Sequence, residues 1–148
     1  GIVRDRLHPR LSAGIMMKAA ARIDVDVVIL SWNRPDDTLA AIASAAAQEG
    51  VRQRLLIVDQ GSAPENLRRL EDYLAGIPDA RLRKLGRNAG VAGGRNLAAA
   101  MGDAPYIVAL DSDAVFKDRQ ALEERLLIRI QQVVAPVQGG PQGLLSGW

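Results

Sequence analysis

The chain has no cysteine and a single histidine, and these two shortages exclude whole classes of chemistry. Without cysteine there is no disulfide framework, no thiolate nucleophile and no zinc ribbon. The histidine, His8, lies in an irregular N-terminal segment, which argues against a Ser-His-Asp triad and against a histidine-based metal site. Any catalysis must therefore use carboxylates and a bound cation.

Long hydrophobic runs and a large excess of charge are also missing. No apolar run approaches the roughly 18 residues of a membrane-spanning helix, and Lys18 interrupts what would otherwise resemble the core of a signal peptide. We therefore expect a cytoplasmic protein, with attachment at the membrane periphery as the alternative. The formal net charge of +2 is too small to indicate a nucleic-acid partner.

What the 148 residues do contain is an alternation of short apolar runs with amphipathic stretches. The pattern predicts strands over 25–30, 55–58, 82–85 and 106–110, and helices over 35–48, 64–74, 91–101 and 122–130. This order is typical of the α/β class, with a mostly parallel sheet and helices on both of its faces. We divide the chain into a basic N-terminal extension (1–22), an α/β domain (23–134) and a Pro/Gly-rich tail (135–148).

A cluster of polar residues follows each of these predicted strands. The clusters are 31–34, 59–62, 88–96 and 111–113. In open parallel sheets, ligands bind beyond the carboxyl ends of the strands. The shared position of the clusters is therefore stronger evidence for a binding site than any single motif.

The most specific cluster is Asp111-Ser112-Asp113, which directly follows the apolar run 107–110. Side chains alternate along a strand, so carboxylates at i and i+2 share a face, and at the end of a strand they can converge on one cation. Mg²⁺ is usually held by one or two carboxylates together with substrate phosphates. The pattern indicates a metal–diphosphate site, with a turn or a cap for the helix near Asp118 as the alternative.

Two further clusters leave alternatives open. Asp59 can form an Asx turn before the next helix, or accept a hydrogen bond from a base or a ribose hydroxyl. The segment 88–96 lacks the G-x-G-x-x-G spacing and predicts a turn followed by a helix. Gly93 and Gly94 would destabilise that helix, so we expect close approach to a ligand or to the neighbouring strand there. Arg95, one turn into the helix, can reach a base or a phosphate.

Together these segments resemble the motifs of the family-2 glycosyltransferases, which have the GT-A nucleotide-sugar-binding fold. The matching segments are 27–34, 56–62, 88–96 and 110–114, and the resemblance covers about residues 23–120. It implies a Rossmann-like α/β fold and an enzyme that uses a nucleoside-diphosphate sugar. The reaction implied is transfer of the sugar to an acceptor glycan or another hydroxyl acceptor, with inversion of the anomeric centre.

The resemblance also implies roles for the matched residues. Ser31 and Asn33 would lie beside the nucleoside, Asp59 would bind the base or ribose, and Arg95 would contact the base or diphosphate. In the D-x-D motif, Asp111 would lie near the ribose and the metal, and Asp113 would ligate the Mg²⁺ or Mn²⁺ that bridges the diphosphate.

The sequence departs from the family downstream of the D-x-D motif. The acceptor-binding half and the general base of the family lie there, where this chain has one predicted helix and the tail. Asp118, Glu123 and Glu124 do not match the position of the base, so we assign no catalytic base. We expect a sheet truncated after the D-x-D strand, a chain that is a fragment or one part of a larger assembly, and self-association through exposed apolar surface.

Two other functions stay open at this point. A non-catalytic nucleotide-binding or interaction domain would keep the same fold. The segment 110–115 also resembles the D-x-D-x-[T/V] motif of haloacid-dehalogenase-type phosphatases, although that motif normally follows the first strand and here it follows the fourth.

Overall fold

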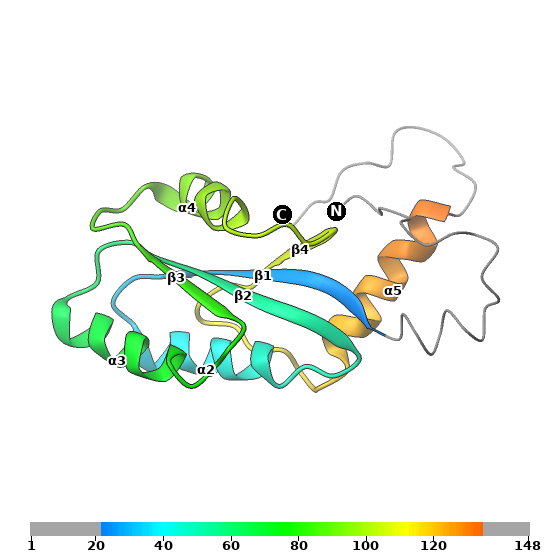
Figure 1. Ribbon diagram of the computed structural model, residues 1–148, viewed down its shortest axis with the longest axis horizontal. Coiled ribbons are helices and arrows are strands. Elements are labelled where there is room, and N and C mark those ends of the chain that lie inside the picture. The colour runs from blue at the N-terminus through cyan, green and yellow to red at the C-terminus, as the bar shows by residue number, and fades with distance from the viewer. Residues whose placement is uncertain (1–21, 135–148) are drawn as a thin grey trace.

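The computed structural model describes residues 22–134, and its centre is a parallel sheet of four strands in the order β3-β2-β1-β4 (Figure 1). The strands are β1 (Ile23–Ser31), β2 (Val51–Asp59), β3 (Ala80–Lys84) and β4 (Tyr106–Ala109), and the helices are α2 (Pro35–Ala46), α3 (Pro64–Leu74), α4 (Gly90–Ala99) and α5 (Ala121–Val134). The predicted α/β class and parallel sheet are confirmed. Of the extension expected over 1–22, only Arg22 is described, and the tail expected over 135–148 lies outside the described residues.

The predicted elements are all present, and the differences lie at their ends. β1 and β2 are each nine residues long, which is longer than predicted, because the hydrophobic signal marks only the part of each strand that is buried on both faces. The amino-terminal parts carry the exposed Asp24 and Arg52, which pair with each other at 2.7 Å. β3 begins two residues earlier than predicted, and α2 and α4 each end two residues earlier. Within residues 22–134, no helix has the length and hydropathy of a membrane-spanning segment.

Helices cover both faces of the sheet, as predicted (Figure 1). On one face, side chains of β1 and β2 pack with α2, α3 and α5 in a core that includes Val25, Val27, Ile29, Ile42, Leu55, Ile57, Leu70 and Leu122. On the other face, α4 packs on a smaller cluster of Val28, Leu56, Val58 and Ala98. The two central strands are therefore enclosed on both sides, which explains their continuous apolar sequences.

The strand order reverses between β1 and β4. Through α2 and α3 the chain passes from β1 to β2 and then to β3, whereas through α4 it returns across the other face of the sheet to β4, on the far side of β1. Open α/β sheets bind their ligands beyond the carboxyl ends of the strands at such a reversal. The topology alone thus points to the ends of β1 and β4 as the place for a site.

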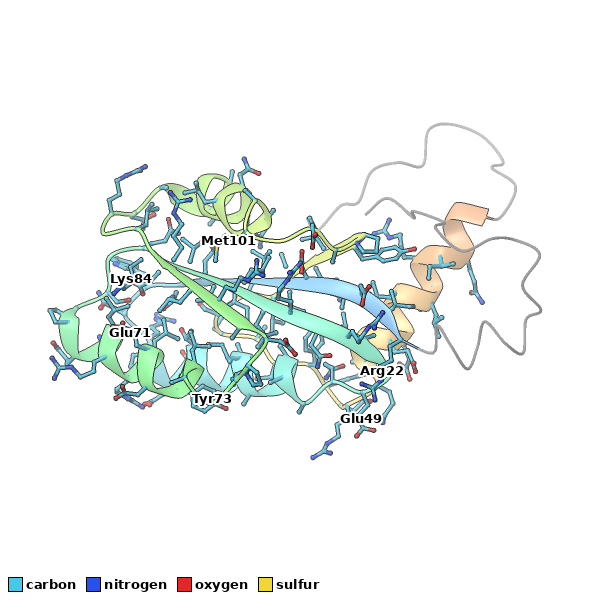
Figure 2. All side chains as sticks on the ribbon, in the orientation of Figure 1. Arg22, Glu49, Glu71, Tyr73, Lys84 and Met101 are labelled. Atoms are coloured by element: carbon cyan, nitrogen blue, oxygen red, sulfur yellow. The ribbon has the colours of Figure 1, made fainter. Side chains whose placement is uncertain are left out.

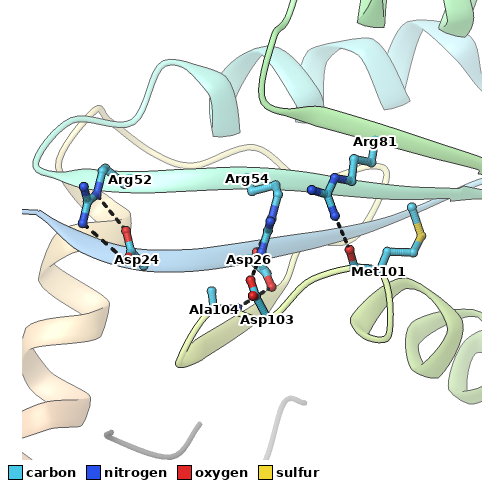
Figure 3. A network of polar contacts seen from close by, with 8 residues as sticks. All are labelled: Asp24, Asp26, Arg52, Arg54, Arg81, Met101, Asp103 and Ala104. Carbon is cyan, nitrogen blue, oxygen red and sulfur yellow. Dashed lines mark hydrogen bonds and ion pairs between the residues drawn. The ribbon is translucent and has the colours of Figure 1, made fainter. Parts of the chain in front are cut away.

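One acidic residue, Asp26, lies in the apolar part of β1 with 1% of its surface exposed. Its carboxylate accepts hydrogen bonds from Arg54 Nε at 3.0 Å and from the backbone N–H of Ala104 at 3.1 Å (Figure 3). Arg54 also donates to Asp103 at 2.6 Å, and chiefly through this hydrogen bond the pKa of Asp103 is lowered and the pKa of Arg54 is raised. The network links the segment between α4 and β4 to the two central strands.

Replacing Arg54 with alanine should destabilise the protein, because the buried carboxylate of Asp26 then loses its counter-ion. We expect a loss of about 3 kcal/mol in the free energy of unfolding, measured with urea. Arg52→Ala is the matched control, since the Arg52–Asp24 side chains are 64% and 50% exposed and their ion pair should contribute less than about 1 kcal/mol. Equal losses in the two variants would contradict the structural role of the buried pair.

Candidate functional site

The carboxyl ends of the strands bring the predicted polar clusters to one edge of the sheet. In the parallel register Ser31 pairs with Asp59, at the last positions of β1 and β2. The residue before Asp111 still donates its backbone N–H to β1, so Asp111 leaves the sheet beside the end of that strand. In Figure 2, Lys84 at the end of β3 marks this edge, whereas Glu49, just before β2, lies at the opposite edge.

Asp59 is buried at the end of β2, with 1% of its surface exposed. Its Oδ2 accepts hydrogen bonds from the backbone N–H groups of Gly61 at 3.2 Å and Ser62 at 2.9 Å, and its Oδ1 accepts the Ser62 hydroxyl at 2.5 Å. The Asx-turn alternative is therefore realised, and it stabilises the turn before α3. Contact of this carboxylate with a base or ribose stays a prediction.

Asn33 joins the turns that follow β1 and β2. Its φ of +49° lies in the left-handed region, which asparagine tolerates better than most residues. Its backbone N–H donates to Ser62 Oγ at 2.8 Å, and its Oδ1 accepts the backbone N–H of Ala63 at 2.7 Å and Nδ2 of Asn66 at 3.1 Å. Ser31 is 5% exposed, and its carbonyl accepts a hydrogen bond from the residue that follows β2. Both residues hold the turns together, and their contact with a nucleoside stays a prediction.

The glycine-rich segment forms the predicted turn and helix α4. Gly90 has a φ of +79°, which favours glycine, and its backbone N–H donates to Asn88 Oδ1 at 2.8 Å. Gly94 is buried, and a Cβ added there would lie 2.9 Å from Leu30 Cδ2 and 3.1 Å from Gln60 Nε2. Of the two explanations predicted for this glycine, the structure shows the close approach to the neighbouring strand.

Arg95 and Asp111, which lie 16 residues apart in the sequence, meet at the carboxyl edge. Arg95 Nη2 lies 3.1 Å from Asp111 Oδ1, and the Asp111 side chain is 69% exposed. Asp113 is exposed in the turn that follows. The structure thus brings Arg95 to the D-x-D motif, and the contact of either with a diphosphate stays a prediction.

The D-x-D aspartates do not cap α5, which was one alternative for them. Instead Asp118 Oδ1 accepts the backbone N–H of Gln120 at 3.0 Å, just before that helix. The other alternative, a turn, is present, because the backbone N–H of Ala114 donates to the carbonyl of Asp111 at 2.9 Å. Within residues 22–134, no group of three or more His, Cys, Asp or Glu side chains could hold a metal ion by itself. Asp111 and Asp113 nevertheless fit Mg²⁺ or Mn²⁺, because such ions commonly take one or two carboxylates and complete their coordination with phosphate oxygens and water.

Glu123, in the first turn of α5, lies away from this edge. Glu123 lies beside Gly50, where an added Cβ would meet its carboxylate, and Gly50 directly precedes β2 at the amino edge.

Sequence analysis missed Gln60, which is 5% exposed and bonded to the segment before α4. The available signal was its position between Asp59 and the glycine-serine turn, at the end of a buried strand.

The fold and this edge together define an open parallel α/β domain with exposed carboxylates beside the reversal of strand order, where such sheets bind their ligands. The family model for glycosyl transferase family 2 matches residues 26–132, and the chain belongs to this family. The resemblance on which the sequence analysis relied is confirmed. Because the match includes the D-x-D strand, it favours a glycosyltransferase over the phosphatase alternative.

A known relative agrees with this assignment. Succinoglycan biosynthesis protein ExoO from Rhizobium meliloti (strain 1021) is 39% identical over 92 residues, which are 61% of this chain and 25% of that protein. The chain therefore spans about a quarter of the length of this relative.

Solved structures share the fold. A mannosyltransferase, PcManGT from Pyrobaculum calidifontis in complex with GDP-Man and Mn²⁺, has a TM-score of 0.65 at 19% identity, covering 78% of this chain and 33% of its own. S. aureus TarS 1-349 in complex with UDP has a TM-score of 0.63 at 18% identity, covering 84% of this chain and 40% of its own. At these identities the likeness establishes the GT-A fold.

Replacing Asp59 with alanine should lower the free energy of unfolding by about 2 kcal/mol, because two backbone N–H groups of the turn and one hydroxyl lose their acceptor. Asp36→Ala is the control, since Asp36 is 87% exposed and its surface pair with Arg69 should contribute less than about 1 kcal/mol. Urea unfolding measures both variants. A loss no larger than that of the control would show that the turn does not depend on Asp59.

Proposed function

We propose that residues 22–134 form the donor-binding domain of a glycosyltransferase, which binds a nucleoside-diphosphate sugar together with Mg²⁺ or Mn²⁺. The observation that carries this proposal is the position of Asp111 and Asp113, which are exposed directly after β4, beside the reversal of strand order. Membership of the family supports it. So do the ligands named for the neighbours, which are GDP-Man with Mn²⁺ and UDP.

The residues at this edge suit successive parts of such a ligand. Ser31 and Asn33 are proposed to lie beside the nucleoside, and Asp59 to accept a hydrogen bond from the base or ribose through the remaining lone pair of its Oδ1. Arg95 supplies a permanent positive charge, and its planar guanidinium matches the geometry of phosphate oxygens. Asp111 is proposed to lie between the ribose and the metal.

The metal would be held by Asp113, with Asp111, and by oxygens of the diphosphate. When bound, the ion would neutralise the negative charge that develops on the departing nucleoside diphosphate. Arg95, on α4, would neutralise part of the same negative charge. The acceptor hydroxyl would attack the anomeric carbon on the face opposite the diphosphate, so that this centre is inverted. Because the chain spans only part of its relative, we leave the sugar, the acceptor and the catalytic base unassigned.

Titration of the full chain with UDP, GDP and dTDP, each with and without Mn²⁺, tests the proposal by calorimetry. Trp32 is 56% exposed directly after β1, so a Trp148→Phe variant, which keeps Trp32 as its one tryptophan, adds a fluorescence signal from this edge. Binding of one nucleotide that Mn²⁺ enhances supports the proposal and identifies the base. A folded chain that binds none of the three would contradict it and favour a non-catalytic interaction domain.

Asp113→Ala should remove the enhancement by Mn²⁺ while leaving the weaker metal-independent binding of the nucleotide intact. Asp59→Ala should weaken binding with and without the metal, by about 1–3 kcal/mol if one charged hydrogen bond is lost. Asp72→Ala, an exposed carboxylate on α3, is the control and should behave as the unmodified chain does. Full enhancement by Mn²⁺ in Asp113→Ala would refute the metal assignment. The measurement is calorimetric titration with the nucleotide that binds best.

A further inference from the structure

Gln60 is a buried polar residue that links the central strands to α4. It follows β2, and 5% of its surface is exposed. Its backbone N–H donates to the carbonyl of Ser31 at 2.8 Å, and its side-chain Oε1 accepts the backbone N–H of Ala89 at 2.8 Å. Ala89 is the residue directly before α4. One residue therefore connects the ends of β1 and β2 to the start of this helix.

Gly94 makes room for this connection within α4. A Cβ at this position would lie 3.1 Å from Nε2 and 3.2 Å from Cδ of Gln60, and 2.9 Å from Cδ2 of Leu30. These separations are shorter than ordinary van der Waals contact, so the helix can lie this close to the sheet because residue 94 has no side chain. Gln60 and Leu30 thus determine how near α4 lies to the strands.

Arg95 is the next residue of this helix, and its guanidinium lies 3.1 Å from Asp111. α4 is ten residues long and has no side-chain hydrogen bond at its N-cap, so its position depends on its contacts with the sheet. We propose that Gln60 is a positioning residue, whose buried amide, accommodated by Gly94, holds α4 so that Arg95 faces the diphosphate of the donor. This inference rests on the proposed function, because its effect is measured on nucleotide binding.

Gln60→Met tests the inference, because methionine has a similar length but offers no strong acceptor to the N–H of Ala89. We expect the dissociation constant for the nucleoside diphosphate with Mn²⁺ to rise about tenfold, because Arg95 would no longer be held in position to contact the diphosphate. Gln53→Met is the matched control. Gln53 Nε2 donates to the carbonyl of Ala45 in the last turn of α2, at 2.9 Å, and to that of Gln48 just after the helix, at 3.0 Å. Its loss should reduce the stability to urea but leave the dissociation constant within about twofold.

A double-mutant cycle with Arg95→Gln separates positioning from general destabilisation. If Gln60 acts through Arg95, then Gln60→Met should weaken binding by less than about twofold in the Arg95→Gln background. A tenfold loss in both backgrounds would show that Gln60 acts independently of Arg95, by direct contact or through stability, and would overturn the inference.

Gly94→Ala provides a second test should Gln60→Met not fold. The added methyl group meets Gln60 and Leu30, so we expect weaker nucleotide binding, about three- to tenfold, and again little effect in the Arg95→Gln background. Gly93→Ala is the control on the same helix, because a Cβ there meets only the Cβ of Ala89, at 3.3 Å. Equal affinities for the two alanine variants would overturn the inference. Failure of the unmodified chain to bind any nucleotide would instead reject the proposed function.

Discussion

The parallel pairing of β1 with β2 is the interaction on which the rest of the structure depends. The two strands pair along their whole nine-residue lengths and are covered by helices on both faces. Because this register ends with Ser31 opposite Asp59, the two turns that follow are close enough for Asn33 and Ser62 to hydrogen-bond. A shift by one residue would turn every side chain of one strand to the opposite face and would separate these turns.

Burial divides the polar residues of the carboxyl edge into two groups. Ser31, Asp59 and Gln60 are at most 5% exposed, and the Ser31 carbonyl, the Asp59 carboxylate and Gln60 Oε1 accept hydrogen bonds from neighbouring turns, because buried polar groups need partners within the protein. Asp111 and Asp113 are exposed, so their oxygens are available to exchange solvent for a ligand. The buried group shapes the turns, and the exposed group offers the charge that a metal and a diphosphate require.

The α/β class, the eight elements and the shared edge could be predicted, because each central strand is an apolar run that ends in turn residues. The hydrogen-bond partners of Asn33 could not be predicted, since they lie 29 to 33 residues away along the chain and depend on the register. Asp26 is a charge inside an apolar run, which signals a buried partner, but only the pairing of β1 with β2 identifies that partner as Arg54. The role of Gly94 likewise depends on how closely α4 lies to Leu30 and Gln60.

Two Asp–Arg pairs of this domain differ in burial, and burial decides what each can do. Asp26 is 1% exposed and bonds to both Arg54 and a backbone N–H. A metal ion could therefore replace Arg54 only if the hydrogen bonds of Arg54 to Asp26 and Asp103 were broken. The Asp111 side chain is 69% exposed, although that of Arg95 is 22% exposed, so solvent screens this pair more than the Asp26–Arg54 pair, and surface pairs contribute only about 0–1 kcal/mol. A metal ion could therefore take the place of Arg95 beside Asp111 at little cost, while the guanidinium gains the diphosphate as its new partner. In the proposed donor site, the small contribution of the Arg95–Asp111 pair allows this change of partners. Before the ligand binds, the pair keeps Arg95 and Asp111 next to each other.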